Sequence, residues 1–115
     1  MLLGMKKRYD KLVRDRVPEI LAERGIPYEV RTADHLELPA LLHAKLAEEA
    51  AELLAATADE ARIEELADML EVIIALGRVY GADRDSLVRV RERKAAERGA
   101  FGAGVVLVST GTDES

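Results

Sequence analysis

The chain has 115 residues, of which 49% are hydrophobic, 34% charged and 3% aromatic, and its formal net charge is −5. This length predicts a single domain, which we expect to span residues 1–108, followed by a disordered tail at residues 109–115. The negative charge and the few aromatic side chains argue against a general nucleic-acid binder. Cysteine is absent, which excludes disulfides and thiolate zinc sites. No apolar run approaches the roughly 18 residues of a membrane span, so we expect no membrane partner and a cytoplasmic location.

The N-terminal part combines a basic segment with a short helix. Residues 6–16, KKRYDKLVRDR, are the densest basic stretch, and VPEILAERG then predicts a helix with Pro18 in its first turn and Gly25 at its end. IPYEVRTA, residues 26–33, alternates apolar and polar side chains. This alternation is compatible with a short strand or with an extended connection.

Three longer helices are predicted from the spacing of apolar residues. They run from about Leu38 to Ala56, from about Asp59 to Tyr80 and from about Arg84 to Arg98. The first two should form an antiparallel hairpin. The second is apolar on nearly every side between residues 66 and 76, which is more than one hairpin can bury. We therefore expect an all-α bundle of about four helices completed by homo-oligomerisation, as a homodimer or larger assembly.

The segment after the last helix contains GAFGAG, residues 99–104, and VVLVS, residues 105–109. GAFGAG follows a helix instead of joining a strand to one, so a helix cap and turn is favoured over a nucleotide-binding fingerprint. VVLVS is compatible with a second short peripheral strand that pairs with the segment around Val30.

Four carboxylates interrupt the apolar lines of the two hairpin helices. Glu49 falls within a line of leucines in EEAAEL with Glu52 one turn away, and Glu65 and Asp68 extend an apolar stripe in EELADMLEVII. Acids at this spacing also occur on solvated helix faces, and that interpretation stays open. Neighbouring acids lie outside the four and are interpreted as surface or supporting residues: Glu48, Glu64 and Glu71.

Clustered acids on buried lines require a cation or a raised pKa, because an unpaired buried carboxylate costs several kcal/mol. Magnesium fits this requirement, since it prefers oxygen ligands and is commonly shared between carboxylates and substrate phosphates. Manganese is a possible substitute. Two ions would formally balance four carboxylates.

The chain resembles the MazG-like nucleotide pyrophosphohydrolases, an all-α superfamily with an ExxE motif followed by ExxD. EAAE at 49–52 and ELAD at 65–68 match the two motifs. KLVRDRVPEIL at 11–21 and RKAAERGAF at 93–101 resemble its phosphoribosyl-ATP pyrophosphohydrolase-like branch. The likeness covers roughly residues 9 to 108, so the expected domain is a MazG-like helical domain.

The resemblance implies magnesium-dependent cleavage of a nucleoside triphosphate between its α- and β-phosphates, giving a monophosphate and pyrophosphate. It carries the roles of metal ligand and catalytic residue to Glu49, Glu52, Glu65 and Asp68, without identifying the base. In related proteins a Lys and an Arg at the spacing of Lys94 and Arg98 follow an Asn. This chain has no such Asn and so departs from the family pattern there.

Four basic residues are candidates for binding the phosphates: Arg14, Arg16, Lys94 and Arg98. Lys94 and Arg98 share a helix face at i,i+4, whereas Arg14 and Arg16 lie in the basic segment. Pairing with nearby surface acids is an equally good interpretation of each. His35 and His43 have no ligand-spaced partners and are expected to be ordinary residues.

Three functions remain open at this point. The leading one is a house-cleaning pyrophosphohydrolase that acts on canonical or damaged nucleoside triphosphates. The second is the phosphoribosyl-ATP step of histidine biosynthesis. The third is a non-catalytic helical dimerisation module. Nothing in the sequence identifies a base pocket.

Overall fold

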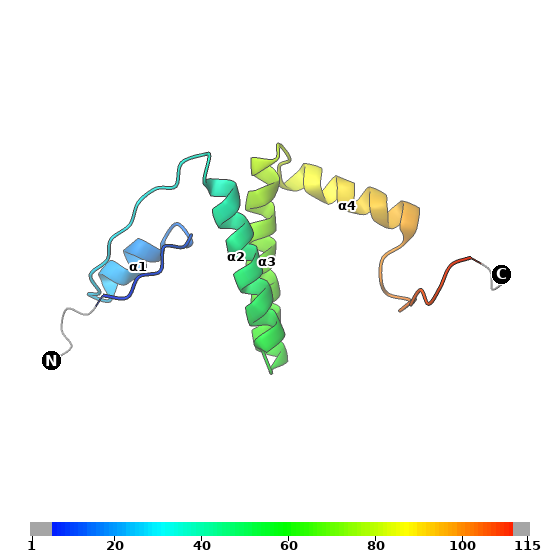
Figure 1. Cartoon of the computed structure of the whole chain (residues 1–115), viewed down its shortest axis with the longest axis horizontal. Coiled ribbons are helices and arrows are strands. Elements are labelled where there is room, and N and C mark those ends of the chain that lie inside the picture. The colour runs from blue at the N-terminus through cyan, green and yellow to red at the C-terminus, as the bar shows by residue number, and fades with distance from the viewer. Residues whose placement is uncertain (1–5, 112–115) are drawn as a thin grey trace.

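The computed structural model describes residues 6–111, and every regular element in that range is a helix (Figure 1). The all-α class is therefore confirmed. The predicted C-terminal tail lies mostly outside the described residues. The four helices follow one another along the chain as α1 (Val17–Glu23), α2 (Leu38–Ala55), α3 (Asp59–Val79) and α4 (Arg84–Arg98).

Local signals place the helix ends close to their predicted positions. Asp34 accepts hydrogen bonds from the backbone N–H groups of Leu36 and Glu37 just before α2. Asp83 caps α4 by accepting from the backbone N–H of Ser86 at 2.8 Å. Gly99, with φ of 79°, ends α4 because this backbone conformation is unfavourable for other residues.

Helices α2 and α3 form the predicted antiparallel hairpin, which carries the core (Figure 1). Thr57 lies in the turn, and residues equally far from it in sequence face each other across the hairpin. Leu42 and Val72 are each fifteen residues away from Thr57, and both are buried. Leu76 completes the buried cluster. The same antiparallel pairing about Thr57 determines which acids of α2 and α3 lie close together.

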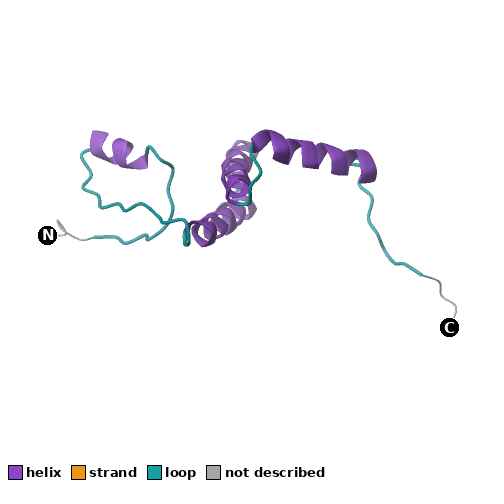
Figure 2. Cartoon of the chain, turned by 90° about the horizontal axis from the view of Figure 1, so that it is seen from above, coloured by secondary structure: helices purple, strands orange, loops and turns teal. Residues whose placement is uncertain are grey.

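The other elements lie on opposite sides of this hairpin. The segment of residues 6–16 and helix α1 lie on one side, whereas α4 leaves the end of α3 and runs away on the other (Figure 2). Helix α4 contacts α3 and makes no contact with α2. Gly77 lets α4 begin close to α3, since a Cβ there would lie 3.0 Å from the Ala82 carbonyl oxygen.

The two peripheral strands that the sequence allowed are absent from residues 6–111: residues 26–33 form the connection given as the alternative, and the strand suggested at residues 105–109 was wrong. Residues 26–33 and 105–109 are both irregular. They lie on opposite sides of the hairpin, and a strand without a neighbour cannot form its backbone ladder (Figure 1).

The chain is far more extended, and exposes more surface, than a compact monomer of the same length. Its Cα radius of gyration is 20.0 Å, against about 13 Å for a compact domain of this length. Its accessible surface is 10364 Å², about 4,200 Å² more than the size scaling for folded monomers gives. No helix among residues 6–111 combines the length and apolarity that crossing a membrane demands.

Candidate metal centre

The hairpin brings three of the four predicted acids together. Glu49 lies eight residues before Thr57 and Glu65 eight residues after it, so antiparallel pairing places them opposite each other. Asp68 lies one turn further along α3. Carboxylate oxygens of Glu49, Glu65 and Asp68 all lie within 4.8 Å of one another.

The centre of this carboxylate cluster is shielded from water. Glu49 is only 5% exposed, the sole charged residue among the buried residues of the described chain. One oxygen of Glu49 and one of Glu65, the Oε2 atoms, are buried and have no hydrogen-bond donor. A buried oxygen without a donor costs free energy, so both atoms call for a proton or a cation.

Crowding of these acids is visible in the pKa of Glu65. The pKa of Glu65 is raised to about 7. The largest cause is the carboxyl of Glu49 at hydrogen-bonding distance, followed by burial and by the carboxyl of Glu52. Like charges at short range cannot all ionise without cost, and one shared proton relieves the repulsion. Glu52 is therefore near Glu65, although it is itself exposed and lies outside the group of three.

Cations of the chain border the cluster on two sides. Arg14 Nη2 donates to Asp68 Oδ1 at 2.7 Å and ties the basic segment to α3. Lys45, one turn before Glu49 on α2, lies with its Nζ 3.3 Å from Glu49 Oε1. Neither cation reaches the two shielded Oε2 atoms.

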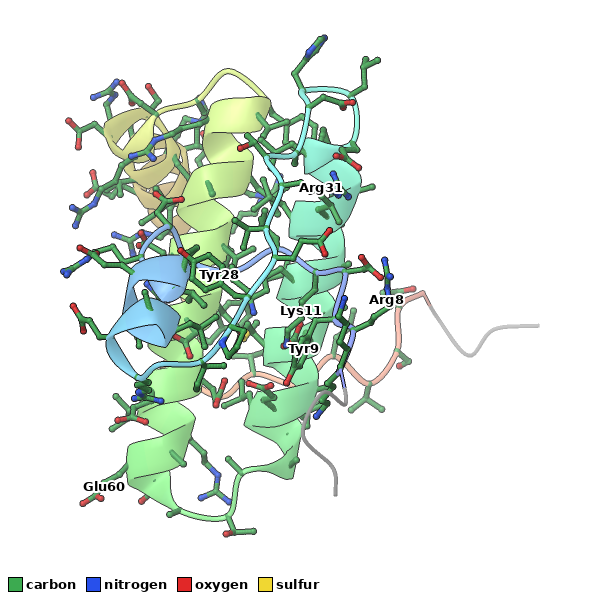
Figure 3. All side chains as sticks on the ribbon, turned by 90° about the vertical axis from the view of Figure 1, so that its left-hand side faces the viewer. Arg8, Tyr9, Lys11, Tyr28, Arg31 and Glu60 are labelled. Atoms are coloured by element: carbon green, nitrogen blue, oxygen red, sulfur yellow. The ribbon has the colours of Figure 1, made fainter. Side chains whose placement is uncertain are left out.

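A second ion pair holds the basic segment against α2. Lys11 Nζ donates to Glu48 Oε1 at 2.8 Å, and this hydrogen bond holds the pKa of Glu48 below its usual range. Figure 3 shows Lys11 and Tyr9 lying across α2, far from Glu60 near the hairpin turn. Sequence reasoning missed Lys45 and Lys11; the i,i+4 spacing of Lys45 and Glu49 was the available signal.

The remaining candidates for phosphate binding do not join the cluster in this chain. Arg16 Nε lies 2.8 Å from Glu19 Oε2, three residues further along the chain in α1. Lys94 and Arg98 are exposed on α4, which points away from the acids (Figure 1). Helix α4 contacts α3 and makes no contact with α2, so these two side chains stay apart from the cluster within one chain.

The two histidines and the neighbouring acids lie outside the group of three carboxylates. His43 Nε2 lies 2.7 Å from the Tyr80 hydroxyl and links α2 to the end of α3. His35 borders a groove near the start of α2. Glu64 and Glu71 are exposed on α3, whereas Glu48 is partly buried beside the cluster.

The donor set fits a hard divalent cation such as magnesium. Three carboxylates converge, two of their oxygens are shielded without a donor, and every available ligand atom is oxygen. Glu52 lies close enough to Glu65 to join them.

Comparison with known proteins identifies the family of this chain. A curated protein of Mycolicibacterium smegmatis, called an uncharacterized protein, is 46% identical over 54 residues, which are 47% of this chain and 55% of that protein. The chain thus spans about half the length of this relative, and no solved structure matches it. The family model described as phosphoribosyl-ATP pyrophosphohydrolase matches residues 7–95. The chain belongs to that family and thereby to the MazG-like nucleotide pyrophosphohydrolase superfamily.

Proposed function

We propose that this protein is a magnesium-dependent pyrophosphohydrolase that cleaves a nucleoside triphosphate between its α- and β-phosphates. The observation that carries the proposal is the pair of shielded Oε2 atoms of Glu49 and Glu65, which face each other without a donor beside Asp68. A solvated acidic surface would leave such atoms in water. The family assignment supports the same reaction class.

Glu49, Glu65 and Asp68 would hold the cation, with Glu52 as a fourth ligand. When bound, magnesium would neutralise charge on the phosphoryl oxygens and favour ionisation of a water nucleophile. A carboxylate oxygen of this cluster that does not contact the ion would take the proton of that water. Burial of Glu49 between α2 and α3 fixes the position of the ligands before the substrate arrives.

Arg14 is the best-placed phosphate-binding residue within one chain. Its guanidinium already contacts Asp68, and its side chain remains 59% exposed, so a triphosphate could reach it. Arg16, Lys94 and Arg98 are proposed as further phosphate contacts, the last two from a neighbouring copy. The guanidinium group suits this role because it binds phosphate oxygens in a bidentate manner.

A second candidate substrate is phosphoribosyl-ATP, because the matching family is described by that activity. Cleavage would occur at the same α–β bond and also release pyrophosphate. The two candidates therefore differ in the nucleoside end of the substrate and share the acidic cluster.

The deciding experiment measures pyrophosphate release with magnesium from a panel of nucleoside triphosphates and from phosphoribosyl-ATP. Pyrophosphate together with a monophosphate is expected; release of inorganic phosphate alone would contradict the proposal. Glu52→Gln and Asp68→Asn should lower turnover at least about 100-fold while preserving helical circular dichroism. Glu60→Gln, an exposed acid outside the cluster, is the matched control. Near-native turnover of either cluster variant at saturating magnesium would remove that residue from the ligand set.

We also propose that the protein self-associates in solution. Four exposed apolar residues on α3 recur at the three- and four-residue spacing of a helix seam: Ile63, Leu66, Leu70 and Ile73. Together with the excess accessible surface, this seam supports packing of two hairpins into a four-helix bundle.

A further inference from the structure

The segment that follows α4 is the most exposed apolar stretch of the described chain. Residues 101 to 108, FGAGVVLV, contain no charged or polar side chain. Their five large side chains are between 78% and 98% exposed: Phe101, Val105, Val106, Leu107 and Val108. A run with this composition is an aggregation hazard when uncovered, so the functional protein must cover it.

Among residues 6–111, the segment has no apolar partner within its own chain. Figure 1 shows it beyond the far end of α4, remote from the hairpin. Folding back would lay it along the second half of α4, RERKAAER, where Ala95 and Ala96 are the only apolar residues. The described residues near the segment therefore leave it uncovered, which favours a partner surface on another molecule.

A suitable surface exists at the open end of the hairpin. The groove there has a volume of about 660 Å³ and is bordered largely by apolar side chains from the basic segment, α2 and α3. These are Leu12, Val13, Leu38, Leu42, Ala75 and Val79. Leu42 is buried at its base, and Val13, which is 37% exposed, stands at its rim.

We propose that residues 101 to 108 of one copy occupy this apolar groove on a second copy of the chain. Charge favours a second copy as the partner, because α4, which leads into the segment, has six basic and three acidic residues. Helices α2 and α3 together have three basic and nine acidic residues. Opposite charge would thus steer α4 of one copy towards the hairpin of another.

The exposed area is also sufficient for this interface. A standard interface buries about 800 Å² on each partner, whereas this chain exposes about 4,200 Å² beyond the expectation for a compact monomer. This excess accessible surface is large enough for two interfaces. One is the contact along the α3 seam, and the other is the docking of residues 101 to 108. The inference rests on the proposed self-association and is independent of the catalytic proposal.

Cross-linking tests the segment directly, because the natural chain contains no cysteine. Two differently tagged copies are co-expressed, one with Val106→Cys and the other with Val13→Cys, and treated with a short bismaleimide. A product joining the two tags is expected. Leu54→Cys replaces Val13→Cys in the matched control, because Leu54 is 86% exposed at the opposite end of α2. Cross-linking to Leu54 as strong as to Val13 would overturn the proposed docking site.

Two further outcomes of this experiment would also overturn the proposal. A double variant, Val13→Cys with Val106→Cys, that links only within one chain would place the segment on its own groove. Loss of the inter-chain product when a non-hydrolysable triphosphate is added would identify the groove as a nucleotide site. Light scattering on the same samples separates failure of docking alone from failure of self-association.

A charge substitution provides the second measurement. Val106→Asp should weaken self-association at least about tenfold, measured as the dissociation constant by sedimentation, because a carboxylate would enter an apolar groove. Ser109→Asp adds the same charge just beyond the apolar run and should change the dissociation constant less than about threefold. Equal dissociation constants for the two variants would contradict the proposal.

Discussion

At the residue scale, the acid inside the apolar line of α2 is the clearest point of conflict between stability and the proposed function. Glu49 is buried, and its only cation within ion-pair distance among the described residues is Lys45. The free energy of bringing a carboxylate out of water exceeds what one partly exposed lysine returns. Under the proposed function, the metal ligands would be held in position at the expense of stability without metal.

Substitution of Glu49 tests this conflict. Glu49→Leu should stabilise the metal-free protein by about 1 kcal/mol or more, because leucine continues the line of Leu42 and Leu46. The melting temperature should rise by roughly 4 °C or more in calorimetry. Magnesium should stabilise the natural protein, by about 2.7 kcal/mol at a hundredfold excess over Kd, but leave the variant unchanged.

The matched control is Glu64→Leu, an exposed acid on α3, which should leave the magnesium response intact. A Glu49→Leu protein that melts lower without metal, yet still responds to magnesium, would make Glu49 an ordinary structural residue.

The raised pKa of Glu65 predicts a pH dependence of metal-free stability. Between about 4.5 and about 7 the folded state binds a proton that the unfolded chain releases. The unfolding free energy should therefore fall as the pH rises through this window. Urea denaturation at a series of pH values measures the slope. Glu65→Gln should flatten it, and a slope unchanged by that substitution would assign the proton to other groups.

At the element scale, the basic segment is attached to the hairpin by two ion pairs and by Leu12, which packs against the buried cluster. Lys11 contacts Glu48 on α2, and Arg14 contacts Asp68 on α3. Partly exposed pairs of this kind contribute up to about 1 kcal/mol each. Under the proposed function, Arg14 would exchange its contact with Asp68 for a contact with substrate at little cost, while Leu12 keeps the segment on the hairpin.

Comparison of two arginines tests the role of this segment. Arg14→Ala should raise KM for the triphosphate about tenfold or more, because it removes a guanidinium from the edge of the acidic cluster. Arg16→Ala removes a guanidinium that pairs with Glu19, so its effect should be smaller. Thermal stability should change by less than about 1 kcal/mol in both variants. Steady-state kinetics showing equal KM values would contradict a special role for Arg14.

At the scale of the whole molecule, the core is very small, since only three apolar residues are buried among residues 6–111. Most large apolar side chains remain exposed, including those along the seam of α3. Under the proposed self-association, a second copy would cover these faces and add hydrophobic stabilisation.

Substitution within the seam tests self-association. Light scattering at micromolar concentration should give at least twice the chain mass for the natural protein. Leu70→Asp should shift it to the monomer mass and lower its stability, because a charge would face the partner helix. Leu70→Met keeps the apolar volume and should stay associated. A monomeric natural protein would reject both the seam and the docking of residues 101 to 108.

The sequence by itself determined the helices and the four acids. Apolar spacing of 3.6 residues, the capping residues Asp83 and Gly99, and the ExxE and ExxD motifs act over a few residues of chain, so they can be read locally. The sequence left residues 26–33 open between a strand and an extended connection, and it suggested a strand at residues 105–109 that does not form. A strand depends on a neighbour, and no local signal shows that residues 26–33 and 105–109 lie on opposite sides of a hairpin.

Only the tertiary structure decided which charges meet. Antiparallel pairing about Thr57 placed Glu49 opposite Glu65, and the path of the basic segment brought Arg14 to Asp68. The same structure separated Lys94 and Arg98 from the acids, because α4 leaves the hairpin where α3 ends. Coulomb energies and burial depend on distances through space, and these distances exist only after the helices have packed.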